Sequence, residues 1–283
     1  MTQAVRRTEN WLTAPDGLLL FRRSWLPAFA PRRSILLVHG FGEHSGRYDA
    51  VATWFCARGC AVYGYDQRGH GRSHGPRTHV DSFEQFLDDL AALHELVRDE
   101  QPSTPITLVG HSMGGLIALA YLSQRKPALR SAIVSAPALA PDRAVSGARV
   151  WLARTLRRLA PRLAMASGLD LTGLSRDDDV LRRYLADPLV VRTMTTSLAA
   201  ELLATAPRVR EDAGQIEVPT LLMHGSADPL CAASASAELA RKLRPTGSGL
   251  ALYPGLRHEI FNEPEREQVL GDAWKWLDAE ADA

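Results

Sequence analysis

The chain has 283 residues, 46% of them hydrophobic and 23% charged, and a formal net charge of +1, which is typical of one α/β domain with an insertion. The balanced charge excludes the strongly basic face that binds nucleic acid. No apolar run approaches the roughly 18 residues of a membrane span and no signal peptide is predicted, so we expect a cytoplasmic protein.

Apolar runs alternate with segments of helical period along most of the chain. This alternation predicts a mostly parallel, eight-stranded sheet with helices on its faces. In chain order we expect a hairpin at 11–25, a strand at 35–38, a helix at 48–58, a strand at 61–65, a helix at 82–101, and strands at 106–109, 131–135, 219–225 and 250–253.

The loop after the strand at 35–38 reads His-Gly-Phe-Gly. By itself the Gly-x-Gly spacing matches half of a nucleotide-binding loop. The third glycine is missing and no acidic ribose partner follows at the expected distance, so a dinucleotide site is not expected. Because the loop follows a central strand, the amide of Phe41 is a candidate donor for an oxyanion hole.

Residues 110–114 read Gly-His-Ser-Met-Gly and lie between the strand at 106–109 and a helical stretch at 116–122. A serine on a sharp strand-to-helix turn needs a glycine two residues away on each side, and this segment supplies both. We therefore predict that Ser112 is a nucleophile at the carboxyl edge of the sheet. The amide of Met113, at a helix N-terminus, is the candidate partner of Phe41 in the oxyanion hole.

Residues 138–210 interrupt the alternation of strands and helices. Leucine, alanine and arginine recur there at helical spacing, and no good strand is predicted. Because the segment follows the sixth strand, we expect a helical cap (138–210) above Ser112, inserted into a core domain made of 1–137 and 211–283.

A serine hydroxyl is a poor nucleophile at neutral pH and needs a histidine base and an orienting carboxylate. Asp228 follows the strand at 219–225, and His258 follows the strand at 250–253. Both therefore lie at the same edge as Ser112, and in the expected chain order. We predict that His258 acts as base and then acid and that Asp228 fixes its tautomer. A turn-forming Asp-Pro and a surface histidine are the alternatives.

Cys56, Cys60 and Cys231 cannot all pair, and none has a metal-type spacing with histidine, so we expect reduced thiols. His70 and His74 lie in glycine-rich chain where helical spacing does not apply, and no metal site is predicted. Cys231 comes three residues after Asp228 and should lie close to its carboxylate, either as a lining group or as an inert buried thiol.

Four motifs stand out along the chain: 39–48 (HGFGEHSGRY), 66–73 (DQRGHGRS), 110–115 (GHSMGG) and 224–228 (HGSAD). Together they resemble the monoacylglycerol lipase and lysophospholipase group of the α/β-hydrolase fold. The resemblance runs nearly end to end and includes Leu-Ser-Arg at 174–176 and Asp-Pro-Leu at 187–189 in the cap.

The resemblance implies a lipase-type cap over an acyl tunnel, cleavage of carboxylic esters of single-chain lipids through an acyl-serine, and no cofactor. It also implies that Glu43, Arg47 and Tyr184 lie near the site of the substrate head group. From the residues alone, an ion pair of Glu43 and Arg47 that braces the oxyanion loop is an equal alternative. Some family lipases carry a second histidine shortly after the catalytic one, whereas Phe261 stands in that stretch here and cannot donate a hydrogen bond to glycerol.

Other chemistries on the same fold stay open, because fold does not fix function. A broad-specificity carboxylesterase, an aminopeptidase and a cofactor-free perhydrolase are the alternatives. A non-enzymatic ligand receptor is disfavoured, since such proteins often lose a triad member and all three are present.

The stretch at 137–165 carries six arginines and one aspartate, with tryptophan and leucine at three- and four-residue spacing. This pattern predicts an amphipathic helix that could dock on an anionic membrane as a peripheral contact. In the alternative, the leucines pack on the core domain and the arginines are solvated. The sequence makes no prediction of oligomeric state.

Overall fold

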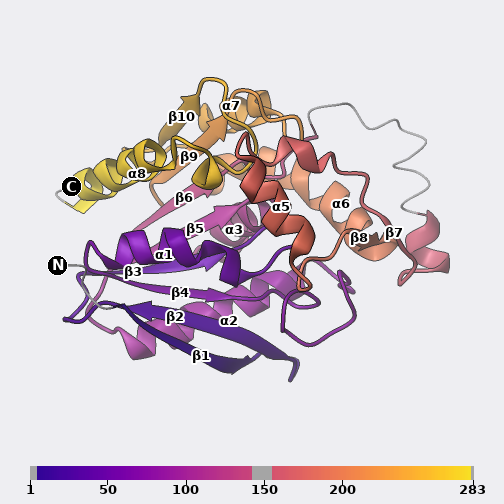
Figure 1. The fold of residues 1–283 in the computed structure, drawn as a ribbon, viewed down its shortest axis with the longest axis horizontal. Coiled ribbons are helices and arrows are strands. Elements are labelled where there is room, and N and C mark those ends of the chain that lie inside the picture. Colours follow the sequence, from indigo (N-terminus) through magenta and orange to yellow (C-terminus); the bar gives the residue numbers. More distant parts are fainter. Residues whose placement is uncertain (1–4, 142–154, 282–283) are drawn as a thin grey trace.

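A computed structural model describes residues 5–141 and 155–281. Its centre is an eight-stranded sheet in the order β1-β2-β4-β3-β5-β6-β9-β10 (Figure 1). The first two neighbouring pairs, β1 with β2 and β2 with β4, are antiparallel, and the others are parallel. The prediction of a mostly parallel eight-stranded sheet is therefore confirmed. The strands are β1 (Arg6–Thr13), β2 (Leu19–Leu26), β3 (Arg33–Val38), β4 (Cys60–Tyr65), β5 (Ile106–His111), β6 (Ser131–Ser135), β9 (Thr220–Gly225) and β10 (Gly249–Tyr253).

Hydrophobic cores cover both faces of this sheet. Every residue of β3, β4, β5, β6 and β9 is buried, which explains why these strands read as continuous apolar runs instead of alternating ones. Along β3, Leu36 and Val38 face one core while Ile35 and Leu37 face the other, as the two-residue period of a strand requires.

Helices fill out the two cores. One face is covered by α2 (Glu84–Glu100), α3 (Met113–Arg125) and α6 (Thr196–Asp212), together with α7 (Ala233–Ala240). The opposite face is covered by α1 (Asp49–Cys56) and α8 (Arg266–Ala281). The predicted helices at 48–58 and 82–101 match α1 and α2, with ends shifted by one or two residues.

The chain between β6 and β9 gathers at one end of the sheet, on the right of the view in Figure 1. It contains β7 (Ala164–Ala166), a 3-10 turn at Leu171–Gly173, α5 (Asp178–Ala186), β8 (Thr193–Thr195) and α6. Strands β7 and β8 pair antiparallel, so the expectation that 138–210 holds no strand is wrong. Each strand has only three residues, too few for a two-residue period to be recognised.

Helix α6 belongs to the core on one side and to this inserted segment on the other. Its Leu198, Ala206 and Val209 are buried in the core beside α3, and residue 210 lies inside the helix. The division of the chain at 138 and 210 stays a prediction. No helix in the described parts of the chain has both the length and the apolar character needed to cross a membrane.

Candidate active site

Ser112 occupies the turn between β5 and α3 with φ +53° and ψ −118°, a region that costs a non-glycine residue roughly 1–3 kcal/mol. Its glycine neighbours permit this turn. A Cβ on Gly114 would lie 2.2 Å from the Val38 carbonyl oxygen, and one on Gly110 would lie 2.5 Å from the Gly114 carbonyl oxygen. The segment thus has the geometry predicted for a nucleophile elbow.

The loop after β3 passes directly beside the serine. A Cβ on Gly40 would lie 3.2 Å from the Ser112 Cβ. The Gly40 amide donates to Glu43 Oε1 at 2.6 Å, so the next amide in the loop, that of Phe41, is the better candidate for the oxyanion hole. Met113 opens α3, where the first amides have no intrahelical acceptor. The assignment of Phe41 and Met113 as oxyanion donors stays a prediction.

Asp228 and His258 are brought together, although 30 residues separate them. His258 Nδ1 donates to Asp228 Oδ2 at 2.7 Å. Burial alone would raise the pKa of Asp228, but hydrogen bonds from His224 and His258 outweigh it and hold the pKa well below its ordinary value. Asp228 therefore stays ionised, as an orienting carboxylate requires.

His111 contacts this pair and directly precedes Ser112 in the chain. Its ring lies 4.7 Å, centroid to centroid, from the ring of His258. Burial lowers the pKa of His111 to about 4, so the ring that contacts His258 is neutral at physiological pH. No hydrogen bond joins the Ser112 hydroxyl to His258 within the described residues; such bonds are often long until substrate binds.

The loop that carries His258 is held by the inserted segment. The His258 amide donates to the Gly173 carbonyl at 3.2 Å, and the Glu259 amide donates to the Leu174 carbonyl at 2.7 Å. Buried Glu263 accepts from the Arg257 amide at 2.6 Å and from the Arg176 amide at 3.0 Å. These bonds give a structural reason for the Leu-Ser-Arg stretch at 174–176.

Glu43 and Arg47 form part of a buried network beside the serine. Arg47 binds Glu259 through two hydrogen bonds of 2.7 and 2.8 Å and also pairs with Glu43. Glu43 accepts from the Tyr48 hydroxyl at 2.7 Å as well. Burial opposes the ionisation of Glu259, yet Arg47 lowers its pKa to about 2. These partners favour the bracing alternative, and substrate contact by Glu43 and Arg47 stays a prediction.

Tyr184 lies on α5 at the junction of the inserted segment and the oxyanion loop. The Arg47 guanidinium stacks over its ring at 4.8 Å. Beside it, the Val191 amide donates to the Gly42 carbonyl at 2.7 Å. Tyr184 is therefore close to the loop that the sequence associates with the head group, and its contact with substrate stays a prediction.

All three cysteines are outside disulfides. The ligand atoms of Asp228, Cys231 and His258 all lie within 4.8 Å of one another, so Cys231 is close to the carboxylate of Asp228, as predicted. This distance would suit a metal ion. Asp228 and His258 are already hydrogen-bonded to each other, however, and the thiol lies beside this pair.

Two residues of the site, His224 and Glu263, were not among the predicted site residues. His224 Nε2 lies 3.0 Å from Asp228 Oδ2, and its position four residues before the aspartate, in the motif at 224–228, is a signal that could have found it. Glu263 has no comparable signal, because its partner Arg176 is 87 residues away in the chain.

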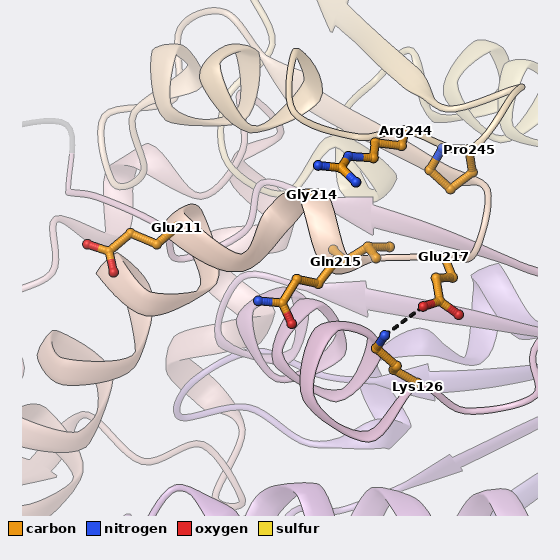
Figure 2. Close-up of a pocket in the computed structure, with 8 residues that line it drawn as sticks. Lys126, Glu211, Gly214, Gln215, Glu217, Arg244 and Pro245 are labelled. Atoms are coloured by element: carbon orange, nitrogen blue, oxygen red, sulfur yellow. Dashed lines mark hydrogen bonds and ion pairs between the residues drawn. The ribbon is translucent and has the colours of Figure 1, made fainter.

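A separate depression of about 580 Å³ is lined by the residues drawn in Figure 2. Lys126 follows α3 directly, whereas Ser112 precedes it, so the 13-residue helix places the two roughly 20 Å apart. Acidic and basic side chains are mixed around the depression, and Lys126 pairs with Glu217 at 2.6 Å. The lining residues are Lys126, Glu211, Gly214, Gln215, Ile216, Glu217, Arg244 and Pro245.

Comparisons with known proteins agree with this geometry. The family described as serine aminopeptidase S33 matches residues 30–265. A monoacylglycerol lipase of Mycolicibacterium smegmatis is 35% identical over 272 residues, covering 96% of this chain and 97% of the lipase. The phospholipase YtpA of Bacillus subtilis is 32% identical over 251 residues, covering 88% of this chain and 96% of YtpA. The crystal structure of the Paleococcus ferrophilus monoacylglycerol lipase superposes with a TM-score of 0.84 at 32% identity, covering 92% and 99% of the two chains.

Proposed function

The chain belongs to the serine aminopeptidase S33 family of α/β hydrolases, and from that premise we propose that it cleaves carboxylic esters of single-chain lipids, of the monoacylglycerol or lysophospholipid type. The observation that carries the proposal is the 2.7 Å bond between His258 Nδ1 and Asp228, next to the strained turn at Ser112. Relatives described as a monoacylglycerol lipase and a phospholipase support the substrate class.

In the proposed mechanism, His258 Nε2 takes the hydroxyl proton as Ser112 Oγ attacks the ester carbonyl. The amides of Phe41 and Met113 hold the negative charge that develops on the carbonyl oxygen. As the tetrahedral intermediate collapses, the bond to the alcohol breaks and His258 gives its proton to the leaving head group.

A water molecule then attacks the acyl-serine, and His258 accepts its proton. The second collapse returns that proton to Ser112 and releases the fatty acid. Asp228 stays ionised throughout, since its role is to hold the imidazole and stabilise its cationic form.

The head group and the chemical class of the substrate are tested together by substrate profiling. We expect monoacylglycerols or lysophospholipids to give the highest kcat/KM, 4-nitrophenyl esters a lower one, and prolyl amides none. Acyl-chain preference should be graded, since each buried methylene contributes about 0.8 kcal/mol, whereas a missing head-group hydrogen bond can reject a substrate strongly. Cleavage of amides in preference to esters would replace the proposal with the aminopeptidase alternative.

We further propose that the inserted segment docks on anionic lipid surfaces as a peripheral contact. Leu159, Leu163 and Met165 are 77%, 46% and 50% exposed, which argues against their packing on the core domain. Arg158 and Arg162 are exposed among them. The described part of this stretch is helical only at 155–159 and turns at 161–162, so the prediction of one amphipathic helix that continues to Leu163 is wrong. Trp151 and Arg154 lie outside the described residues.

Co-sedimentation with vesicles tests this docking. We expect binding to anionic vesicles that weakens with salt, falls in Arg158→Glu/Arg162→Glu and is absent with neutral vesicles. The matched control, Arg182→Glu on α5, reverses one exposed arginine that lies outside this stretch. Absence of vesicle binding at low salt would discard the docking proposal and leave the hydrolase proposal intact.

A further inference from the structure

A second buried histidine, His224, contacts the same carboxylate oxygen of Asp228 as His258 does. His224 lies near the end of β9 and is 0% exposed. Its Nε2 lies 3.0 Å from Asp228 Oδ2 and 3.1 Å from the Cys231 carbonyl oxygen. Its Nδ1 lies 2.8 Å from the hydroxyl of Ser236 on α7.

These partners fix where the ring carries its proton. Both neighbours of Nε2 are oxygens that can only accept, so Nε2 must donate. Nε2 is therefore held as a proton donor by the loop that follows β9, and the Ser236 hydroxyl on α7, which can donate or accept, holds Nδ1.

The contact also completes the hydrogen bonding of the aspartate. Oδ1 of Asp228 accepts from the amides of Leu230 and Cys231 at 2.8 and 3.0 Å. Oδ2 accepts from His258 at 2.7 Å and from His224 at 3.0 Å. With each oxygen bonded twice, the carboxylate cannot rotate without breaking bonds, and Oδ2 stays directed at the catalytic imidazole.

Three of the other buried histidines differ in this respect. His70, His79 and His94 each have one ring nitrogen without a hydrogen-bond partner among the described residues. Both nitrogens of His224 are bonded, and one of them is directed at the carboxylate on which the proposed mechanism depends. A histidine that only fills space in the core would not need a ring nitrogen directed at this carboxylate.

We propose that His224 is a positioning residue for ester hydrolysis: it donates a hydrogen bond to Asp228 Oδ2, fixes the rotation of the carboxylate and shares the charge that acts on His258. This inference rests on the proposed triad. Removing the donor leaves more unshared charge facing His258, which stabilises the cationic imidazole and moves the acid limb of the kcat/KM profile to higher pH.

The test compares His224→Leu with His224→Gln, because a glutamine amide can replace the Nε2 donor and leucine cannot. We expect kcat to fall about 10-fold or more in His224→Leu, as a hydrogen bond to a charged group contributes about one or two factors of ten. KM should change little, the acid limb should move upward, and His224→Gln should recover most of kcat and the original midpoint.

The control pair, His94→Leu and His94→Gln, changes a buried histidine on α2 that bonds the Tyr121 hydroxyl. Both controls should keep the wild-type pH midpoint. A midpoint in His224→Leu equal to that of wild type, or equal losses of kcat in His224→Leu and His224→Gln, would overturn the proposal and leave His224 a structural residue.

A double-mutant cycle separates this proposal from the triad assignment. If His224 acts through Asp228, His224→Leu should cause no further loss in an Asp228→Asn background. Full activity of Asp228→Asn alone would refute the triad itself, whereas additive losses in the double variant would refute only the role of His224.

Nitrogen NMR of histidine-labelled wild-type enzyme gives a readout that needs no folded leucine variant. The resonances lost in His224→Gln should report a protonated Nε2. A bare Nε2 would overturn the proposal.

Discussion

Among the glycines that the structure describes, Gly114, two positions after Ser112, is the one where an added Cβ would lie closest to the backbone. A side chain there would meet backbone rather than a movable side chain, since a Cβ would lie 2.2 Å from the Val38 oxygen and 2.4 Å from the His39 oxygen. Strand β3 and helix α3 can approach this closely only over glycine, and that approach sets the oxyanion loop beside Ser112.

We predict that Gly114→Ala destabilises the protein by about 3 kcal/mol and removes esterase activity, because β3 must shift to admit the methyl group. The control is Gly271→Ala on α8, where nothing lies within 4 Å of the added Cβ. That change should stabilise the protein by about 0.5–1 kcal/mol. Urea denaturation and ester hydrolysis measure both, and an unaffected Gly114→Ala would contradict the packing described for the elbow.

At the scale of elements, the loops that carry Asp228 and His258 are in contact with the inserted segment, which is distant from them in the chain. Residues 173 and 174 accept the amides of His258 and Glu259, and a Cβ on Gly173 would lie 2.3 Å from Pro229, the residue after Asp228. The inserted segment therefore contacts the loops of both the aspartate and the histidine.

Two acidic residues pair with Arg176, and they allow a matched test of the contact between the inserted segment and the His258 loop. Glu263 is buried and binds both Arg176 and the Arg257 amide, whereas Glu265 is exposed and binds Arg176 alone. We expect Glu263→Gln to destabilise the protein by about 2 kcal/mol and to lower kcat more than KM changes, since the His258 loop loses a charged acceptor. Glu265→Gln should leave thermal stability and kcat near wild type. Equal effects of the two variants would show that Arg176, and not the buried carboxylate, holds the loop.

The elements also show where the sequence was informative. The sheet and the elbow could be predicted because buried parallel strands read as apolar runs and Gly-x-Ser-x-Gly has a steric reason. The proximity of Asp228 and His258 could be predicted because parallel strands end at one edge of the sheet. Strands β7 and β8 could not be predicted, because three residues are too few for a two-residue period to be recognised. The partnership of Arg176 with Glu263 could not either, because it exists only after the inserted segment folds onto the core.

For the whole molecule, burial of neutral histidines between the sheet and its loops has a consequence for acid stability. Burial lowers the pKa of His39 and His111 to about 4 each and that of His70 to about 3. The unfolded chain titrates these groups near 6.5, so it binds protons first as pH falls, and each shift costs the folded state stability in acid. Asp89, whose pKa burial raises to about 6, acts in the opposite direction. Asp228 and Glu259, whose pKa values are held below the ordinary range, act in the same direction as the histidines.

We therefore predict that the free energy of unfolding falls as pH decreases from 6.5 towards 4. Urea denaturation at a series of pH values across that range measures it. His70→Gln should flatten the profile, since it removes one of the three groups. A free energy that stays constant or rises towards pH 4 would show that these histidines are protonated in the folded protein.

The proposed mechanism depends on Ser112 being the nucleophile, and active-site labelling tests this most directly. We predict that a fluorophosphonate probe labels the wild-type enzyme at Ser112 alone, and that Ser112→Ala is folded, unlabelled and roughly 10⁶-fold slower in ester hydrolysis. Combining it with His258→Ala should add little, because the three residues act as a unit. Labelling or ester hydrolysis that persists in folded Ser112→Ala would contradict the account.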